Sequence, residues 1–566
     1  MSSNKRMTTE TPGLVMEKLW VTVVMWLRKR TPPSVFGTLP LTSYRFFQVY
    51  VHHNLLLLSI VSMPTVLYHT RINRYTVAMK LIHTLLLLSI TVTAQAQNFP
   101  SLEAADKAYN YAQRIAGNNA HWRDLADAAL WVSSVNAGQG AEERAAAFLA
   151  QIEAAAAELA AELPRDPKER GEYVLGFIHR RYLKSYVINQ TRLDEIFISG
   201  RYNCVSSAVL YMALAVSAGL DVEGVMTRDH AFATIAIGAD RFDVETTNPY
   251  GFDPGNRKEF HDGFGQTTGF AYVPARNYRD RAAIGRGELI SLILSNRIAA
   301  LEERNRFEEA VPLAVNRAVL LSGITVHNNA SSEKTQLFGD PQKDMMTRLS
   351  NLGAHFIQTG KEDNAIAWAF YAGERFPDPL WDDQIKTAAN NKLVKLIRAK
   401  KTGDARSFLA TVKPRLSNAH YMELEILVLE TEIAEKINTI GNPGDAEAAL
   451  ASFNQVKERL PPGRRDEMLT TIILNETSRL GKSQDWAASI KWLEGAIAQY
   501  GRNAKLESAL RTVRQNRVNE LHNAFAALFN KGDYEQAKAT VKNALQEFPN
   551  ERQLANDLAI VERAMQ

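Results

Sequence analysis

Apolar residues recur at helical spacing in the first well-patterned stretch of the chain, residues 101–163. Its second half is rich in alanine and glutamate, and the larger apolar residues share one helical face: Leu149, Ile152, Ala156 and Leu159. Pro164 and Pro167 interrupt this pattern, and a second helical pattern covers residues 168–186. We therefore expect a helical segment over residues 97–165, ahead of a separate module.

The hydrophobic pattern then changes from helical spacing to short apolar runs. Asn203 is a good N-cap for a helix that ends just before Gly219. Three strands are expected after it, at residues 222–226, 230–237 and 241–246. The last two are joined by a turn at Gly238. A helix followed by antiparallel strands predicts an α+β module over residues 166–280.

Nearly all of residues 285–566 has the period of amphipathic helices, and helical hairpins recur. They share a frame in which a turn glycine is followed by two alanines and a proline, at offsets 0, 5, 12 and 17. Two stretches fill the frame: Gly360, Ala365, Ala372, Pro377 and Gly532, Ala537, Ala544, Pro549. Asn305 and Gly481 begin looser copies. A tight turn, closely packing alanines and a helix-stopping proline resemble the tetratricopeptide repeat, so we expect an all-α, tetratricopeptide-like solenoid. Another kind of α-helical bundle is the alternative.

The start of the chain carries a targeting pattern. Residues 79–96 combine a short basic start, an apolar run and an Ala-x-Ala end, which predicts a secretory signal peptide cleaved after Ala96. The apolar run is short for a membrane span, so a membrane anchor is the lesser alternative and no span is expected in the mature chain. A basic leader, residues 1–78, precedes it, which favours Met79 as the true start over a translated leader. We expect an exported protein, periplasmic or secreted.

Charge and cysteine content narrow the function classes. The net charge is +4, but residues 1–80 hold ten basic and two acidic residues, so the remainder is mildly acidic. That balance gives no electrostatic reason to expect a nucleic-acid partner. The single cysteine, Cys204, excludes an internal disulfide, and without a cluster of His and Cys residues no metal site is indicated.

The candidate chemistry centres on Cys204, in the first turn of its predicted helix. Unpaired backbone N–H groups and the positive end of the helix dipole favour the thiolate there. His230, at the start of a strand, can act as base to this thiol, and a carboxylate on the next strand can orient the imidazole. Asp243 and Glu245 are two apart and face the same side of that strand. Glu245 lies closer to the level of His230 in a hairpin centred on Gly238, and Asp243 remains the alternative.

These residues resemble the transglutaminase-like superfamily, a papain-like α+β fold that includes cysteine peptidases and peptide N-glycanases. The family has a glycine shortly before a helix-starting cysteine, then His-Ala-aromatic, then an acid, a small residue and threonine. This chain supplies Gly200, Cys204, His230-Ala231-Phe232 and Glu245-Thr246-Thr247 in that order. The family usually has Asp at the position of Glu245 and Trp at that of Phe232. The resemblance covers about residues 166–275.

The resemblance implies a cysteine acyl-transfer enzyme that needs no cofactor and acts on a protein or peptide. Cys204 would attack a carboxamide or peptide carbonyl and form a thioester, which water hydrolyses or an amine converts into a cross-link. The sequence does not choose between the two. The helical repeats are expected to bind a protein partner. The alternative is a non-catalytic transglutaminase-like scaffold, in which Cys204 is a buried structural residue.

Overall fold

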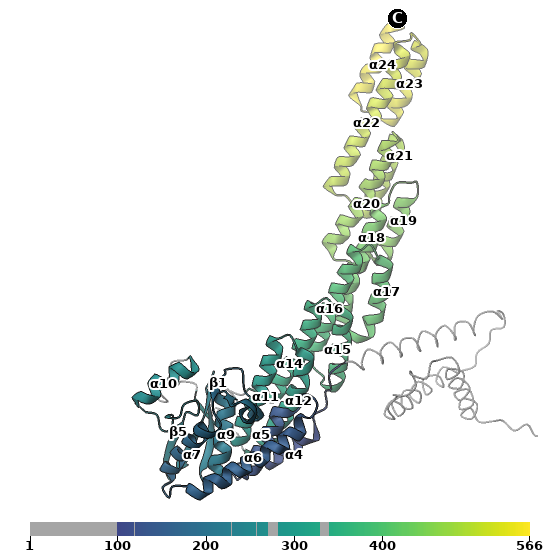
Figure 1. Ribbon diagram of the computed structural model, residues 1–566. Helices are drawn as coiled ribbons and strands as arrows, with labels where there is room; N and C mark the ends of the chain where they lie inside the picture. Colours follow the sequence, from purple (N-terminus) through teal and green to yellow (C-terminus); the bar gives the residue numbers. More distant parts are fainter. Residues whose placement is uncertain (1–98, 118, 228, 256, 270–280, 329–338) are drawn as a thin grey trace, which may run out of the picture. The chain divides into compact units, whose positions relative to one another are not determined.

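A computed structural model describes residues 99–117, 119–227, 229–255, 257–269, 281–328 and 339–566 (Figure 1). The predicted basic leader, residues 1–78, and the predicted signal peptide, residues 79–96, lie outside the described residues. Among the residues that the structure describes, no helix combines the length and apolar character needed to cross a bilayer.

Within the described residues, three helices precede the α+β module, in the stretch where the apolar spacing predicts helix. They are α4 (Asp106–Arg114), α5 (Trp122–Ser134) and α6 (Ala141–Glu162). Helix α5 is apolar on nearly all faces and is correspondingly buried, with α6, α9 and α11 packed around it. The N-terminal helices are therefore part of the core and not an appendage.

The α+β module begins with a helix that is shorter than the sequence pattern suggests. Helix α7 (Pro167–Arg181) ends five residues before the predicted end at residue 186. The chain turns there because β1 (Ser185–Tyr186) pairs in parallel with β2 (Arg201–Tyr202), a contact that helical periodicity cannot reveal. Helix α8 (Leu193–Ser199) connects these two short strands.

Helix α9 (Cys204–Ser217) is the centre of the module. It is apolar all round, and all of its residues from Val205 to Ala215 are buried. Its predicted ends are confirmed, since Asn203 is the N-cap and Gly219, one residue past the C-cap, takes a left-handed φ of 77°. Cys204 therefore begins a rigid, fully packed helix.

An antiparallel sheet packs on α9. Its strands are β3 (Asp221–Met226), β4 (Ala231–Ile237), β5 (Asp240–Val244) and β6 (Ala282–Ile284), in the order β5-β4-β3-β6. The predicted turn at Gly238 is confirmed. Strand β6 lies beyond residue 280, the expected end of the module, because it completes the sheet beside β3. Helix α10 (Lys258–Thr268) lies between β5 and β6 in the sequence.

The remainder is a series of helical repeats, in which successive helices pack as antiparallel hairpins (Figure 1). The first helices are α11 (Arg286–Glu303), α12 (Phe307–Asn328), α14 (Pro341–Gln358), α15 (Glu362–Arg375), α16 (Leu380–Arg398) and α17 (Thr402–Val412). The later helices are α18 (Asn418–Asn438), α19 (Asp445–Val456), α20 (Pro462–Lys482), α21 (Trp486–Tyr500), α22 (Ala504–Phe529), α23 (Tyr534–Glu547) and α24 (Arg552–Ala564). Short 3₁₀ turns, η3 (Lys413–Arg415) and η4 (Lys457–Arg459), follow α17 and α19.

Five of the hairpin turns between described helices have the same backbone geometry. Each places one residue in the left-handed region: Asn305, Gly360, Lys400, Gln484 and Gly532. In each, the N–H of the following residue donates to a carbonyl five residues back, at 2.8–3.1 Å, which is a Schellman C-cap. Five residues after each turn residue lies a small, fully packed side chain: Ala310, Ala365, Ala405, Ser489 and Ala537.

The looser copy of the frame at Gly481 is wrong by three residues. Gly481 lies inside α20, and Gln484 takes the left-handed turn with a φ of 56°. If the frame begins at Gln484, the two positions that hold alanine in the other copies fall on Ser489 and Ala496, and both are buried. The frame was placed on Gly481 because glycine is the usual residue at a left-handed turn. A Schellman cap also accepts a polar residue such as Gln484 at that position, at moderate energetic cost.

One buried core joins the module to the first repeats. Its buried residues extend along the sequence from Leu102 to Val428. Helix α11 contacts α5, α9 and β3 on one side and α12 on the other. The first repeat helix is therefore also a wall of the α+β module.

Candidate functional site

The helix that carries Cys204 is fixed at its first turn by a capping box. The Asn203 side-chain oxygen accepts from the Ser206 backbone N–H at 3.0 Å, and the Ser206 hydroxyl accepts from the Asn203 backbone N–H at 2.9 Å. The Asn203 amide also donates to the carbonyl of Ile188 at 3.1 Å. Cys204 is the next residue and is partly exposed. Its thiol thus lies at the positive end of a helix whose start cannot fray.

His230 and Glu245 form a short, enclosed pair. The His230 Nε2 atom donates to Oε2 of Glu245 at 2.6 Å. The His230 side chain is 14% exposed and that of Glu245 is 3% exposed. The other carboxylate oxygen, Oε1, accepts from the hydroxyl of Thr247 at 2.8 Å and from its backbone N–H at 3.3 Å. Both oxygens of Glu245 are therefore held, and the imidazole is oriented by one of them.

The electrostatic surroundings of His230 favour its charged form. Burial by itself lowers the pKa of His230, but the negative charge of Glu245 and a hydrogen bond with the Cys204 side chain outweigh it, and the pKa lies well above its usual value. The thiol, the imidazole and the carboxylate are thus adjacent in that order. An imidazole between a carboxylate and a thiol is an arrangement that can activate a nucleophilic cysteine.

Asp243, the alternative acid, has a different partner. Its carboxylate accepts from both terminal nitrogens of Arg281, with Nη1 at 2.7 Å from Oδ2. The guanidinium of Arg281 also lies over the ring of Phe232, 5.1 Å from its centroid. Asp243 therefore belongs to a bidentate ion pair beside the site, and the structure does not bring it to His230.

The strand that carries both acids ends earlier than the predicted residue 246. The ladder between β4 and β5 stops at Val244, which pairs with Ala233. Glu245 then bends into a turn, and its backbone N–H donates to the carbonyl of Gly251 at 2.8 Å. The alternation that would place Asp243 and Glu245 on one face thus does not extend to Glu245.

That turn requires a glycine. A Cβ atom added to Gly251 would lie 2.0 Å from the carbonyl oxygen of Glu245 and 3.0 Å from that of Asn248. Since both contacts are with backbone, no side-chain rotation could relieve them. Asn248 is itself buried and lies close to Gly263 of α10. The turn over residues 248–251 therefore fixes the position of the site's carboxylate.

Three further side chains hold the segment after Glu245. His179 of α7 donates through Nε2 to the carbonyl of Thr246 at 3.0 Å, and burial lowers the pKa of His179 to about 4, so its ring is neutral. Ser207 of α9 shares a hydrogen bond of 2.8 Å with the hydroxyl of Thr246. Tyr202 donates to the carbonyl of Thr247 at 3.2 Å. No spacing rule points to His179 or Ser207, because their partners lie 67 and 39 residues away.

Two tyrosines flank the thiol from the β1–β2 ribbon. The rings of Tyr186 and Tyr202 meet edge to face, with centroids 5.9 Å apart. Burial is the main cause that raises the pKa of Tyr186, and the charges of Cys204 and Glu245 add to it. Tyr202 is buried, whereas Tyr186 is partly exposed beside the thiol. Tyr186 therefore forms part of the approach to Cys204.

The described residues contain no group of three or more His, Cys, Asp or Glu side chains placed to hold a metal ion.

Comparisons with known proteins give little beyond this geometry. No family model matches the chain, and no curated protein matches it. Among solved structures, the chain is similar to a crystal structure of the TPR domain of P58(IPK), with 12% identity over 47% of this chain and 75% of that one and a TM-score of 0.15. The helical-repeat architecture rests on the helices and turns described above.

Proposed function

We propose that this chain is an exported, cysteine-dependent acyl-transfer enzyme with a transglutaminase-like module. The observation that carries the proposal is the sequence of contacts from Cys204 through His230 to Glu245. A partly exposed thiol at a helix start, an imidazole of raised pKa and a buried, doubly held carboxylate are together in one site. Each of these groups alone is common in protein cores, but their combination is typical of nucleophilic catalysis.

The first half of the proposed reaction forms a thioester. The Cys204 sulfur attacks the carbonyl carbon of a carboxamide or peptide, and the carbonyl electron pair moves to oxygen. None of the described hydrogen bonds uses the backbone N–H of Cys204, which is thus available to stabilise this oxyanion. When the carbon–nitrogen bond breaks, the leaving amine takes a proton from the His230 imidazolium.

The second half regenerates the enzyme. Neutral His230 removes a proton from water or from an acceptor amine, whose oxygen or nitrogen attacks the thioester. The carbon–sulfur bond breaks, the thiolate returns beside the imidazolium, and a carboxylic acid or a new amide leaves. The Glu245 side chain holds Nε2 of His230 throughout, which leaves Nδ1 to serve the thiol.

The proposal extends to location and partners. A signal peptide over residues 79–96 would direct the chain to the periplasm or outside the cell, where a protein or peptide substrate is met. We propose that the helical repeats bind a protein partner, since stacked hairpins offer an extended surface made from many similar units.

Covalent trapping tests the reaction. The chain starting at Gln97 is incubated with a library of glutamine-containing peptides, and the intact protein is weighed by mass spectrometry. We expect an adduct on Cys204 equal to a peptide minus ammonia. The adduct should be absent in Cys204→Ala and strongly reduced in His230→Ala.

His261→Ala is the matched control, because His261 is an exposed histidine on α10 of the same module and should keep the adduct. A thiol that forms no adduct and reacts with iodoacetamide only after denaturation would refute the enzyme. The module would then be the non-catalytic scaffold, with the repeats as its working surface.

A further inference from the structure

A second, basic cleft lies beside the α+β module. It has a volume of about 800 Å³, and most of its lining comes from three segments that are distant in sequence, with Glu195 of α8, Arg201 of β2 and Glu309 of α12 completing it. The three segments are the loop after α5 (136–138), the loop after β1 (187–192), and the end of α11 with its turn into α12 (296–306). Helix α11, whose C-terminal end lines the cleft, packs on both α5 and α9.

Arginine dominates the charge of this cleft. Five arginines line it: Arg192, Arg201, Arg297, Arg304 and Arg306. Only two acidic residues line it, Glu195 and Glu309. Because the chain after residue 80 is mildly acidic as a whole, this is a local concentration of positive charge.

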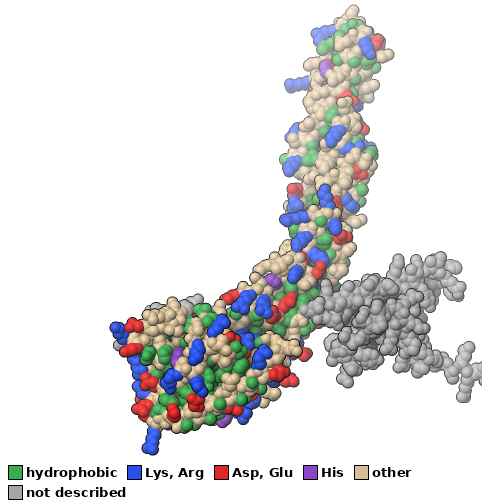
Figure 2. All heavy atoms as spheres, in the orientation of Figure 1, with side chains coloured by type: hydrophobic (Ala, Val, Ile, Leu, Met, Phe, Trp, Pro, Cys, Tyr) green, Lys and Arg blue, Asp and Glu red, His purple; other side chains and the backbone are tan. Residues whose placement is uncertain are grey.

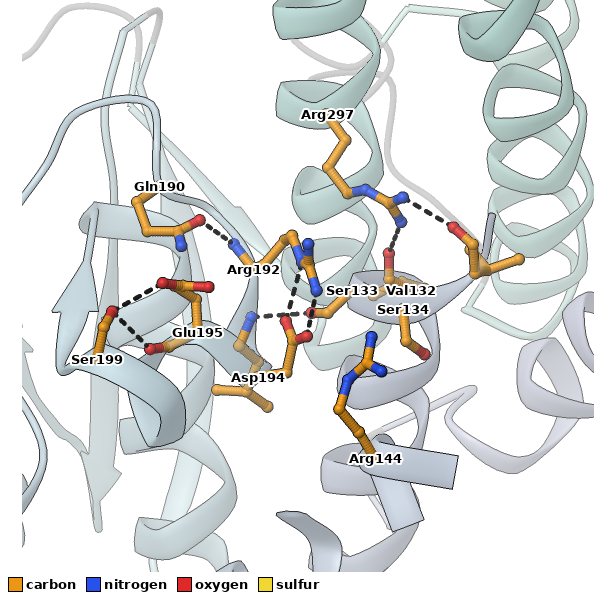
Figure 3. A network of polar contacts seen from close by, with 12 residues as sticks. Val132, Ser133, Ser134, Arg144, Gln190, Arg192, Asp194, Glu195, Ser199 and Arg297 are labelled. Atoms are coloured by element: carbon orange, nitrogen blue, oxygen red, sulfur yellow. Dashed lines mark hydrogen bonds and ion pairs between the residues drawn. The ribbon is translucent and has the colours of Figure 1, made fainter. Parts of the chain in front are cut away.

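Two of the arginines are held in place by contacts with the protein. The side chain of Arg297 donates to the carbonyls of Val132 and Val135 at 2.6 and 2.7 Å, at the C-terminal end of α5 (Figure 3). Burial lowers the pKa of Arg297 to about 10, so it remains charged at neutral pH. Arg192 is paired with the buried carboxylate of Asp194, as Figure 3 also shows. These contacts fix the position of positive charge at the base of the cleft.

Two other arginines are available to a ligand. Arg306 is neutralised by Glu309, with Nε 2.5 Å from Oε1. Arg201 and Arg304 are exposed, and within the part of the chain that the structure describes neither forms an ion pair with an acid. The cleft thus presents two unneutralised guanidinium groups above a charged and rigid floor.

The cleft is attached to the start of the catalytic helix. The loop 187–192 receives hydrogen bonds from Asn203 at the Ile188 carbonyl and from Ser206 at the Gln190 carbonyl, the latter at 3.2 Å. Arg201 precedes Cys204 by three residues, so their Cα atoms are at most roughly 11 Å apart. A chain bound in the cleft could therefore extend to the thiol.

The chemistry of the lining selects the class of ligand. Guanidinium groups bind carboxylates through paired hydrogen bonds, and the amides of Asn189, Gln190 and Asn296 can both donate to and accept from a peptide backbone. A volume of this order holds a few residues, not a long polymer. On the face drawn in Figure 2, basic and acidic side chains are interspersed along the helical repeats, so that face has no continuous basic stripe of the kind that follows a nucleic-acid backbone.

We propose that this cleft binds an acidic peptide segment, whose Asp or Glu carboxylates pair with Arg201 and Arg304. Its role as the site that presents an acidic substrate segment to Cys204 rests on the proposed function, whereas the binding itself does not.

Fluorescence anisotropy tests the binding without turnover. The chain starting at Gln97 with Cys204→Ala is titrated into a fluorescein-labelled octapeptide of alternating Glu and Ser. Octapeptides with Gln or Lys in place of Glu serve as comparison probes. We expect the Glu peptide to bind at least tenfold more tightly than the Gln peptide and to weaken as salt is raised.

Arginine variants locate the binding. Arg201→Gln with Arg304→Gln should weaken binding of the Glu peptide at least tenfold, and each single variant at least threefold. Arg511→Gln with Arg552→Gln is the matched control, because both arginines are exposed, lie far along the repeats on α22 and α24, and give the same change in charge. This control should change the affinity less than twofold.

Three outcomes would overturn the proposal. They are equal binding of the Glu and Gln peptides, unchanged binding by the Arg201 and Arg304 variants, or tighter binding of a short single-stranded oligonucleotide than of the Glu peptide. The Cys204→Ala background keeps the two proposals separable. If peptide adducts never form on Cys204 but this binding persists, the enzyme proposal fails and the acidic-peptide site stands.

Discussion

Replacing Glu245 with glutamine changes one charge in the site and almost nothing in its shape. The carboxylate oxygen that accepts from His230 at 2.6 Å becomes a neutral amide atom. Because the charge of Glu245 is a main cause that raises the pKa of His230, the variant disfavours the imidazolium. The thiolate–imidazolium pair is then less populated relative to the neutral thiol and imidazole.

The expected decrease in the thiolate–imidazolium population follows from the loss of the charged hydrogen bond between Glu245 and His230. A hydrogen bond to a charged group contributes about 1.5–3 kcal/mol. The pKa of His230 should therefore fall, and each 1.4 kcal/mol of lost stabilisation is about a tenfold change in the equilibrium. The population of the ion pair should fall by about ten- to one-hundredfold.

The rate of alkylation by iodoacetamide at pH 6 measures this population without a substrate. A free cysteine is mostly protonated and slow at that pH, whereas a thiolate paired with an imidazolium is fast. We expect Glu245→Gln to slow alkylation of native protein about tenfold or more. The difference should shrink above pH 9, where a thiol ionises without help from the imidazolium.

Asp243→Asn is the matched control, because it also removes one carboxylate charge from the same segment. Asp243 is paired with Arg281 and not with His230, so alkylation should change less than twofold, with a loss of stability on the order of 1 kcal/mol. On any substrate found by trapping, Glu245→Gln should lower turnover by about three to four orders of magnitude. Equal losses in the two variants, or a larger loss in Asp243→Asn, would refute the assignment of Glu245 as the orienting acid.

Three other variants or measurements test separate parts of the account. Gly251→Ala should destabilise the protein and slow alkylation of Cys204, because the new Cβ would lie 2.0 Å from the backbone oxygen of Glu245. Urea unfolding and the rate of alkylation by iodoacetamide measure the two effects. An unchanged rate would contradict the close packing of this turn. Ala537→Leu should lower the free energy of unfolding by about 1–3 kcal/mol because Ala537 is fully buried between helices, whereas Ala555→Leu on the exposed side of α24 should be nearly neutral. N-terminal sequencing of protein from its native host should begin at Gln97, and a mature chain that starts before the predicted signal peptide would contradict the cleavage site.

The sequence by itself determined the features that depend on neighbouring residues. The Asn203 cap, the Cys204 helix start and the stop at Gly219 follow from local hydrogen bonding and backbone freedom. The turn at Gly238 and the hairpin frame at Gly532 are local in the same way. The helical spacing of apolar residues also predicted most of the helices, because a helix that buries one face needs apolar residues at that spacing.

Tertiary structure decided which acid meets His230. The sequence favoured Glu245 over Asp243 by counting along a hairpin, but the strand ends before Glu245, so that count does not establish the contact. The two acids differ because Arg281, 38 residues further along the chain, forms an ion pair with Asp243. The bend that turns Glu245 toward the imidazole depends on the close approach of Gly251.

Long-range packing also determined contacts that the local sequence pattern does not predict. Helix α7 stops early because Ser185–Tyr186 finds a strand partner past α8, and the neutral ring of His179 finds the Thr246 carbonyl 67 residues on. The basic cleft exists because α11 packs against both α5 and α9, and so brings arginines from 192 to 306 into one site. Such contacts are set by the shape of the whole core, since a residue's partners across it are chosen by packing and not by spacing along the chain.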